Sequence, residues 1–175
     1  MKSCAITGQR PSKFKFKSDE TQTGCKRLKK RLHDQFISLY NQGVRRFYVG
    51  GALGVDMWAA EILLRLKEHP DYQDIELVEV LPFEGHDARW DERSRNRMSF
   101  LREHSDFVII VSDKKDQNSY FKRSAYMVNH SDCLLAVYDN AQSVQSMTAM
   151  AVRLAHQRGL LITIIDPNSG KVCNA

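Results

Sequence analysis

The sequence lacks three features that would assign it to a common class: a membrane-length apolar run, a paired-cysteine motif, and histidines at metal-ligand spacing. Its 175 residues contain four scattered cysteines without a C-x-x-C pair, which is not the pattern of a zinc site or a disulfide framework. No stretch approaches the roughly 20 apolar residues of a membrane span, and no signal peptide is recognisable. We therefore expect a reduced, cytoplasmic protein without a structural metal, a cofactor or a membrane partner.

Internal repeats and low-complexity segments are also absent, which argues against solenoid and disordered architectures. The chain has 175 residues, of which 42% are hydrophobic. That length suffices for one well-packed core and is short for two independent ones. We expect a single domain over residues 1–175.

Acidic residues are in the minority. The sequence has 21 Asp and Glu against 26 Lys and Arg, a formal charge of +5, and a pI of about 9.1. This balance favours anionic partners, but it does not choose between nucleotides and nucleic acid. The excess is concentrated around Lys13–Lys17 and Lys26–Arg31. Basic runs of this kind are often no more than solvated faces, so both interpretations stay open.

Six short apolar runs show little alternation between apolar and polar residues, which is typical of parallel strands covered on both faces. Longer segments with helical periodicity lie between them, and the two kinds of segment alternate along the chain. This pattern predicts an α/β fold: a Rossmann-like three-layer open sheet, mainly parallel, of about six strands with helices on both faces. The expected strands are Ser3–Ile6, Arg46–Val49, Ile75–Leu81, Phe107–Val111, Cys133–Tyr138 and Leu160–Ile165. The expected helices are Asp19–Gln42, Val55–His69, Arg89–His104, Tyr120–Asn129 and Val144–Arg158.

A glycine-rich turn, "GGALGVD", joins the second expected strand to its helix. Ligands of open parallel sheets bind outside the carboxyl ends of the strands, where glycines let the backbone approach them. The alternative is that Gly50, Gly51 and Gly54 only make a tight turn with close helix contact. Asp56 follows just inside the helix, where it is suited either to a ribose or base hydrogen bond or to capping its own helix.

Other expected strands also end in polar or glycine-containing segments. The first runs into "TGQRPS", which supplies Thr7, Gly8 and Arg10, a planar donor for phosphate or carboxylate. The third runs into "LPFEGH" and the fifth into "VYDN". The segment "RWDERSRNR" further along either covers the cleft or forms exposed ion pairs. Because parallel strands end at one edge of a sheet, we expect one shared cleft there.

In this order and spacing, "ITGQRP", "GGALGVDMWAAE", "LPF" with Trp90 downstream, and "HSDCLLAVYD" resemble the YpsA-like proteins of the SLOG superfamily. That superfamily is named after the DNA-processing protein Smf/DprA and the cytokinin-activating enzyme LOG. The resemblance covers about Lys2 to Ile165. It implies a Rossmann-like domain that binds nucleotides or nucleotide-derived molecules such as ADP-ribose or NAD derivatives.

The resemblance also implies which residues line the pocket. Trp90 matches a position near the pocket where it can stack on a base. Asn129 and Asp132 are similar to positions that face the cleft or order its loops. The two glycine-containing loops supply the rest of the ligand-binding set: Thr7, Gly8, Arg10, Gly50, Gly51, Gly54 and Asp56.

Two differences from known sequence motifs narrow the range of functions that we expect. "GGALGVD" is not G-x-G-x-x-G, so an ordinary NAD-dependent dehydrogenase is not indicated. The PGGxGTxxE motif of LOG-like phosphoribohydrolases, which holds phosphate and a catalytic glutamate, is missing from "YDNAQSVQSMTAMAVRL". The leading hypothesis is a sensor or binding module for a nucleotide-derived molecule.

Two alternatives remain beside this hypothesis. One is a nucleotide hydrolase or transferase with LOG-like cleavage of an N-glycosidic bond, and the other is DprA-like binding of single-stranded DNA. The sequence does not identify the ligand or establish whether any reaction is catalysed. It is compatible with a homo-oligomer.

Overall fold

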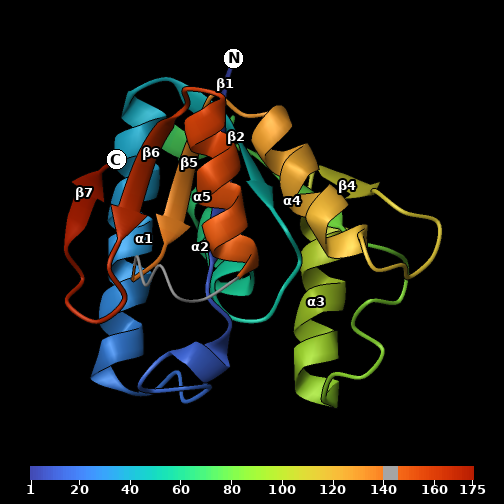
Figure 1. Ribbon diagram of the computed structural model, residues 1–175. Coiled ribbons are helices and arrows are strands. Elements are labelled where there is room, and N and C mark those ends of the chain that lie inside the picture. The colour runs from blue at the N-terminus through green and yellow to red at the C-terminus, as the bar shows by residue number, and fades with distance from the viewer. Residues whose placement is uncertain (140–145) are drawn as a thin grey trace.

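The computed structural model describes residues 1–139 and 146–175. Its sheet has seven strands in the order β4-β3-β2-β1-β5-β6-β7 (Figure 1). The expected mainly parallel sheet is therefore confirmed. The strands are β1 (Lys2–Gly8), β2 (Val44–Val49), β3 (Glu76–Leu81), β4 (Phe107–Ile110), β5 (Cys133–Val137), β6 (Leu161–Ile165) and β7 (Val172–Asn174).

Six of these strands are the predicted apolar runs, and they pair in parallel throughout. The seventh, β7, was not predicted and pairs antiparallel with β6, with Val172 opposite Ile165. Its three residues, Val-Cys-Asn, are too few to produce an apolar run. The tight turn before it depends on Asp166, whose Oδ1 accepts hydrogen bonds from the amides of Asn168 and Ser169.

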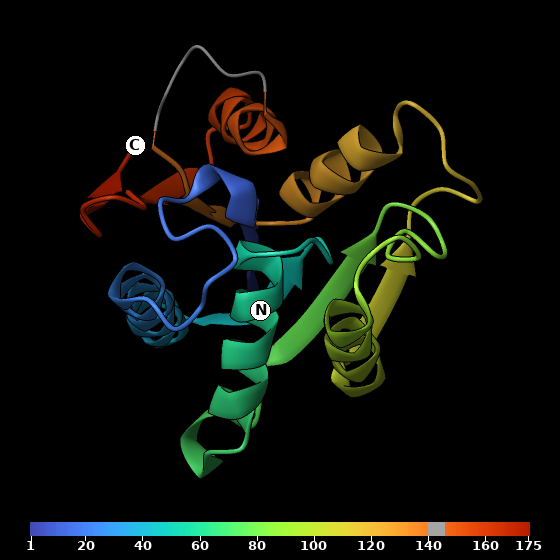
Figure 2. The same ribbon diagram turned by 90° about the horizontal axis from the view of Figure 1, so that it is seen from below.

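Helices cover both faces of the sheet, and Figure 2 shows this separation from below. Helices α1, α2 and α3 lie on one face, and α4 and α5 lie on the other. The helix expected from Val144 corresponds to α5, although Val144 itself falls outside the described residues. The bounds are α1 (Thr23–Asn41), α2 (Val55–Lys67), α3 (Glu92–His104), α4 (Ser119–Asn129) and α5 (Met147–Gln157).

Two apolar cores follow from the pleat of the strands. In β3, Leu77 and Leu81 belong to the core under α1, α2 and α3, whereas Val78 and Val80 belong to the core under α4 and α5. Successive side chains of a strand point to opposite faces. A strand buried on both faces must therefore be apolar at nearly every position, as the sequence indicated.

The edge strand β4 departs from this rule. Phe107 is 50% exposed, Ile110 43% and Val108 39%. The strand pairs only with β3 among the described residues, so its apolar sequence does not correspond to burial on both faces. The expectation of two covered faces was wrong for this strand.

The strand order reverses between β1 and β5, which are neighbours although most of the chain separates them. In open parallel sheets, the carboxyl ends of the two strands at such a point flank the usual ligand site. The loops that follow β1 and β2 lie at this end of the sheet. Within the described ranges, no helix combines the length and the apolar character needed to cross a membrane.

Candidate functional site

A cleft of about 440 Å³ lies at the carboxyl ends of β1 and β2. Three segments surround it: the loop and short helix η1 (Pro11–Lys13) after β1, the start of α2, and the start of α3. Its apolar part includes Leu53 and Met57, and its rim carries arginine, serine and carboxylate side chains. The predicted residues Arg10 and Gly54 both line it.

Two arginines of this cleft are available to an anion. Arg10 follows β1, and Arg93 lies in the first turn of α3; both are exposed. Among the residues that the structure describes, neither guanidinium makes a hydrogen bond or an ion pair. A planar guanidinium without a protein partner can donate two parallel hydrogen bonds to a phosphate or carboxylate.

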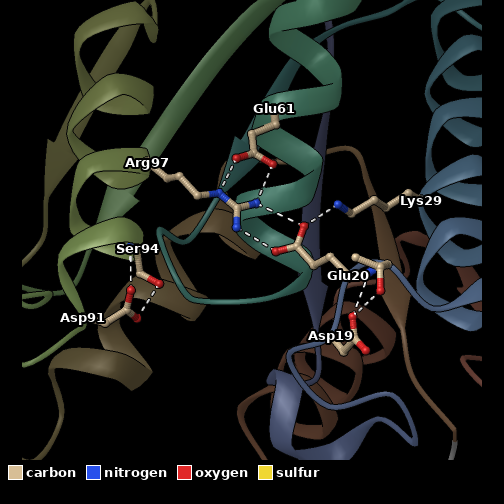
Figure 3. A network of polar contacts seen from close by, with 8 residues as sticks. Asp19, Glu20, Lys29, Glu61, Asp91, Ser94 and Arg97 are labelled. Carbon is tan, nitrogen blue, oxygen red and sulfur yellow. Dashed lines mark hydrogen bonds and ion pairs between the residues drawn. The ribbon is translucent and has the colours of Figure 1, made fainter.

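Arg97, the third arginine of the cleft, is fully engaged (Figure 3). Its Nε lies 2.7 Å from Glu61 Oε1 of α2, and its Nη1 lies 2.6 Å from Glu20 Oε2 in the loop before α1. Lys29 of α1 also pairs with Glu20. Burial opposes ionisation of Glu20, but hydrogen bonds from Arg97 and Lys29 outweigh it and lower its pKa to about 2. The network connects three segments of the cleft wall. The guanidinium of Arg97 is paired with two carboxylates and is therefore not available to a ligand.

The two helix N-termini at the cleft differ. At α3, Asp91 caps the helix, because its Oδ1 accepts from Ser94 N at 3.0 Å and its Oδ2 from Ser94 Oγ at 2.7 Å. At α2, Gly54 is the N-cap residue and no side chain caps the helix. The first backbone N–H groups of a helix carry partial positive charge. The N-terminus of α2 is therefore the one that can receive an anion.

Asp56 is turned into the protein, where it is 6% exposed. Its Oδ2 accepts a hydrogen bond from Ala52 N at 3.3 Å, and the buried Arg123 of α4 donates from Nη1 to Gly50 O at 3.0 Å. Burial raises the pKa of Asp56, and the charge of Arg123 opposes this. A Cβ on Gly50 would lie 2.7 Å from Asp56 Oδ2 and 3.0 Å from Arg123 Nε. Both charged groups thus lie beside Gly50, and each makes a hydrogen bond to the backbone of the glycine-rich turn.

The other glycines of the predicted set are also tightly packed. A Cβ on Gly8 would lie 2.4 Å from the Val55 side chain. A Cβ on Gly51, at φ 64°, would lie 2.4 Å from the Leu81 side chain, and a Cβ on Gly54, at φ 87°, would lie 2.9 Å from Pro11. These contacts support the tight-turn alternative. A side chain at any of these positions disturbs folding, so only residues outside the turn can test binding cleanly.

Thr7 and Trp90 belong to neighbouring parts of the protein rather than to the cleft wall. Thr7 lines an internal cavity of about 10 Å³ beside Asp56 and Arg123. Trp90 packs edge-on against His86 at 5.4 Å between ring centroids. His86 Nε2 lies 2.8 Å from Gly51 O, and its Nδ1 is buried without a partner in the described chain. Trp90 therefore supports the turn through His86.

Asn129 and Asp132, expected to face the cleft or to order its loops, lie at the amino-terminal end of the strands, opposite the cleft described above. Asn129 ends α4 and accepts from Arg158 Nη1 at 3.0 Å, while Asp132 precedes β5. Asp132 Oδ2 accepts from Ser3 N at 2.8 Å and from Ser3 Oγ at 3.0 Å. Residues before a parallel strand belong to the amino edge. Asp132 therefore orders the start of β1.

Sequence reasoning missed the buried polar groups near the turn. It considered Arg123 either as a phosphate contact or as a packing residue of its helix, not as a buried partner of the turn. It did not single out Glu79 of β3, which is 1% exposed with both carboxyl oxygens unpartnered within the described residues. Burial and the nearby Asp56 raise the pKa of Glu79 to about 8. A charged residue inside an otherwise apolar strand, "ELVEVL", was the signal that could have identified it.

Sequence comparison finds relatives of similar length. A UPF0398 protein of Bacillus cereus strain G9842 is 32% identical over 142 residues, covering 79% of this chain and 75% of that protein. A UPF0398 protein of Staphylococcus saprophyticus is 29% identical over 145 residues, covering 81% and 75%. One from Halalkalibacterium halodurans is 32% identical over 142 residues, covering 79% and 73%.

The fold is similar to that of DNA processing protein A from Helicobacter pylori, whose structure was described for its single-stranded DNA binding mode. The TM-score is 0.59 at 15% sequence identity, over 94% of this chain and 65% of that one. This chain thus matches less than two thirds of that protein, and the likeness concerns the fold. The sequence model of the YspA SLOG family, YpsA, matches residues 4–169. The resemblance seen in the motifs is thereby confirmed, and the chain belongs to the YpsA family of SLOG proteins.

Proposed function

We propose that the cleft between η1, the start of α2 and the start of α3 binds a nucleotide-derived molecule of the ADP-ribose type, as a sensor or binding module. The observation that carries this proposal is the convergence of Arg10, Arg93 and the uncapped N-terminus of α2 on one cleft. Phosphate is a suitable ligand for such a set because it accepts hydrogen bonds from guanidinium and helix N–H groups together. No catalytic residue is required, which agrees with the missing LOG-type glutamate.

The distribution of charge around the cleft suggests how such a ligand is oriented. Glu20 and Asp91 line the same cleft as the arginines. Their carboxylates repel phosphate and accept hydrogen bonds from ribose hydroxyls. The partly exposed Leu53 provides an apolar surface for a base or the face of a sugar, whereas Met57 is buried at 2% exposure. The phosphates of the ligand therefore belong beside Arg10 and Arg93, and its uncharged part beside the apolar surface.

Arg10→Ala and Arg93→Ala are each expected to weaken binding of ADP-ribose by about 10–100-fold, because each removes a charge-assisted hydrogen bond of about 1.5–3 kcal/mol. Isothermal titration calorimetry measures this loss directly. Both side chains are exposed, so the melting temperature without ligand should stay unchanged.

Arg31→Ala is the matched control. Arg31 is an exposed arginine of α1 that does not line the cleft, and its removal changes the net charge by the same amount. Equal affinity of all three variants for ADP-ribose would contradict the cleft assignment. Rapid release of free base from nucleoside monophosphates would instead favour the hydrolase alternative.

Single-stranded DNA is a second candidate because of the likeness to the fold of DNA processing protein A. The basic start of α1 is the most charged segment, but part of it is neutralised. Lys29 pairs with Glu20, and Lys30 Nζ lies 3.2 Å from Asp34 Oδ1. This favours weak binding driven by net charge over a dedicated groove.

Binding of a mixed-sequence single-stranded oligonucleotide is expected at low salt and should disappear by about 0.15 M salt, where exposed charges are screened beyond roughly 8 Å. Fluorescence anisotropy at several salt concentrations measures this. Double-stranded DNA of equal length serves as the control, since comparable binding marks a non-specific interaction. Submicromolar affinity for the single strand that survives about 0.15 M salt would make nucleic acid the partner.

A further inference from the structure

We propose that Cys4 and Cys133 form a dithiol site at the amino edge of the sheet, which a hydroperoxide converts to a disulfide between β1 and β5. The two residues are direct partners in the parallel pairing of these strands. Both side chains belong to the core on the α1 face. They lie 129 positions apart in the sequence, so only the register of β1 against β5 places the two thiols side by side.

The spacing of the strands suits a disulfide. Neighbouring strands lie about 4.8 Å apart, and disulfides usually join Cα atoms about 4.4–6.8 Å apart. In the reduced protein, Cys4 Sγ donates to Ala5 O at 3.3 Å and Cys133 Sγ donates to Ser3 O at 3.6 Å. These bonds are weak because a thiol is a weak donor, so they do not fix the two sulfur atoms in place.

Access distinguishes the two thiols. Cys4 is completely buried, whereas Cys133 is 9% exposed. Cys133 also lines a pocket of about 430 Å³ at the amino edge of the sheet, beside Lys2 and Asp132. A small peroxide entering this pocket meets Cys133 first, with Cys4 directly behind it.

The electrostatics agree with this order of reaction. Hydrogen bonding with Cys4 lowers the pKa of Cys133, and Lys2 acts in the same direction, while burial and Asp132 oppose them. The interaction with Cys133 and burial raise the pKa of Cys4. The thiolate is the nucleophile in cysteine oxidation. Cys133 is therefore the attacking residue and Cys4 the resolving one.

The reaction has two steps. The Cys133 thiolate attacks one oxygen of the hydroperoxide, the O–O bond breaks, and the second oxygen leaves as alcohol or water after taking up a proton. Cys133 is then a sulfenic acid. The Cys4 sulfur attacks the Cys133 sulfur, the S–O bond breaks, and the hydroxyl leaves as water with the proton of the Cys4 thiol. The two thiols lose two electrons, which reduce the peroxide.

The test uses the folded full-length chain with Cys173→Ser, because Cys173 is the exposed cysteine and would form intermolecular bridges. The protein is treated with hydrogen peroxide, unfolded with iodoacetamide present, and digested for mass spectrometry. Two of the three remaining thiols should be lost, in one peptide that joins Cys4 to Cys133. Cys25 should be alkylated, and dithiothreitol should restore the two lost thiols.

Cys25→Ala is the matched control, since Cys25 is also buried, and this variant should still lose both thiols. Cys133→Ala should leave Cys4 reduced. Oxidation of the chain in guanidinium should give all pairings, which shows that the folded sheet selects one. Recovery of both Cys4 and Cys133 as alkylated thiols from the treated folded protein, or pairing of Cys133 with Cys25, would overturn the proposal. Because the site lies at the amino edge, its failure leaves the proposed cleft untouched.

Discussion

The free energy of unfolding of the unmodified protein is expected to fall by about 4 kcal/mol between pH 5 and pH 9, and Glu79→Gln is expected to abolish this fall. Glu79 lies in the middle of β3, is 1% exposed, and has no hydrogen-bond partner for its carboxyl oxygens among the described residues. Asp56 and Asp87 add negative potential, and Arg102 offsets part of it. Glutamine has nearly the same shape and no charge.

The direction of the effect follows from the raised pKa. Below the ordinary glutamate pKa of 4.5, both the folded and the unfolded chain hold the proton, so Glu79 has little influence. Between pH 4.5 and about 8, only the unfolded chain loses it, and stability falls as the pH rises. Above about pH 8 the folded protein ionises as well, and the loss levels off. Glu20, with a pKa lowered to about 2, acts in a separate window below pH 4.5.

Urea unfolding at a series of pH values measures the effect, and the difference between the two proteins isolates Glu79 from Asp56, which both retain. Glu76→Gln is the control. Glu76 lies on the same strand, but its Oε2 pairs with Arg46 Nε at 2.6 Å near the surface, and such pairs contribute about 0–1 kcal/mol. Parallel pH profiles for the unmodified protein and Glu79→Gln would contradict the prediction.

Arg123→Met is expected to destabilise the protein by about 3–5 kcal/mol, as removal of one partner from a buried charge pair usually does. The buried guanidinium lies beside Gly50, near the Asp56 carboxylate, and donates to Gly50 O. Without it, a buried carboxylate and a buried carbonyl lose their compensation. The loss should be smaller at acidic pH, where Asp56 can take up a proton.

A double-mutant cycle tests the reason for this loss. The free energy of unfolding lost on Asp56→Asn should be about 1–3 kcal/mol smaller in the Arg123→Met background than in the unmodified protein, since neighbouring charges are coupled. Arg158→Met is the control, because Arg158 is exposed and its guanidinium donates to the side chain of Asn129 at 3.0 Å rather than to a buried group. Equal stability of the Arg123→Met and Arg158→Met variants would show that Arg123 and Asp56 do not stabilise the glycine-rich turn.

The sequence by itself determined the class of fold and most of its elements. Runs buried on both faces of a sheet must be apolar throughout, so six strands were readable locally. The ends of two helices were readable as well, because Gly43 at φ 94° and Gly159 at φ 66° occupy a backbone region that other residues rarely adopt. The seventh strand and the exposure of β4 could not be predicted from the sequence. Three residues are too few to show a periodic pattern, and an apolar edge strand has the same sequence pattern as a central strand.

For the candidate site, the sequence placed Arg10 and Gly54 at the carboxyl end of the strands, because Arg10 belongs to the loop after a strand and Gly54 precedes a helix. Tertiary structure decided which charges are free. Arg97 is occupied by Glu20, 77 positions away, and Glu61, 36 positions away, and Arg123 reaches Gly50 across 73 positions. Three arginines of the same chain thus differ in role: Arg10 is a free donor among the described residues, Arg97 connects neighbouring segments, and Arg123 is a buried counter-charge. Charge availability depends on which side chains meet in space, and the chain order of those side chains does not contain that information.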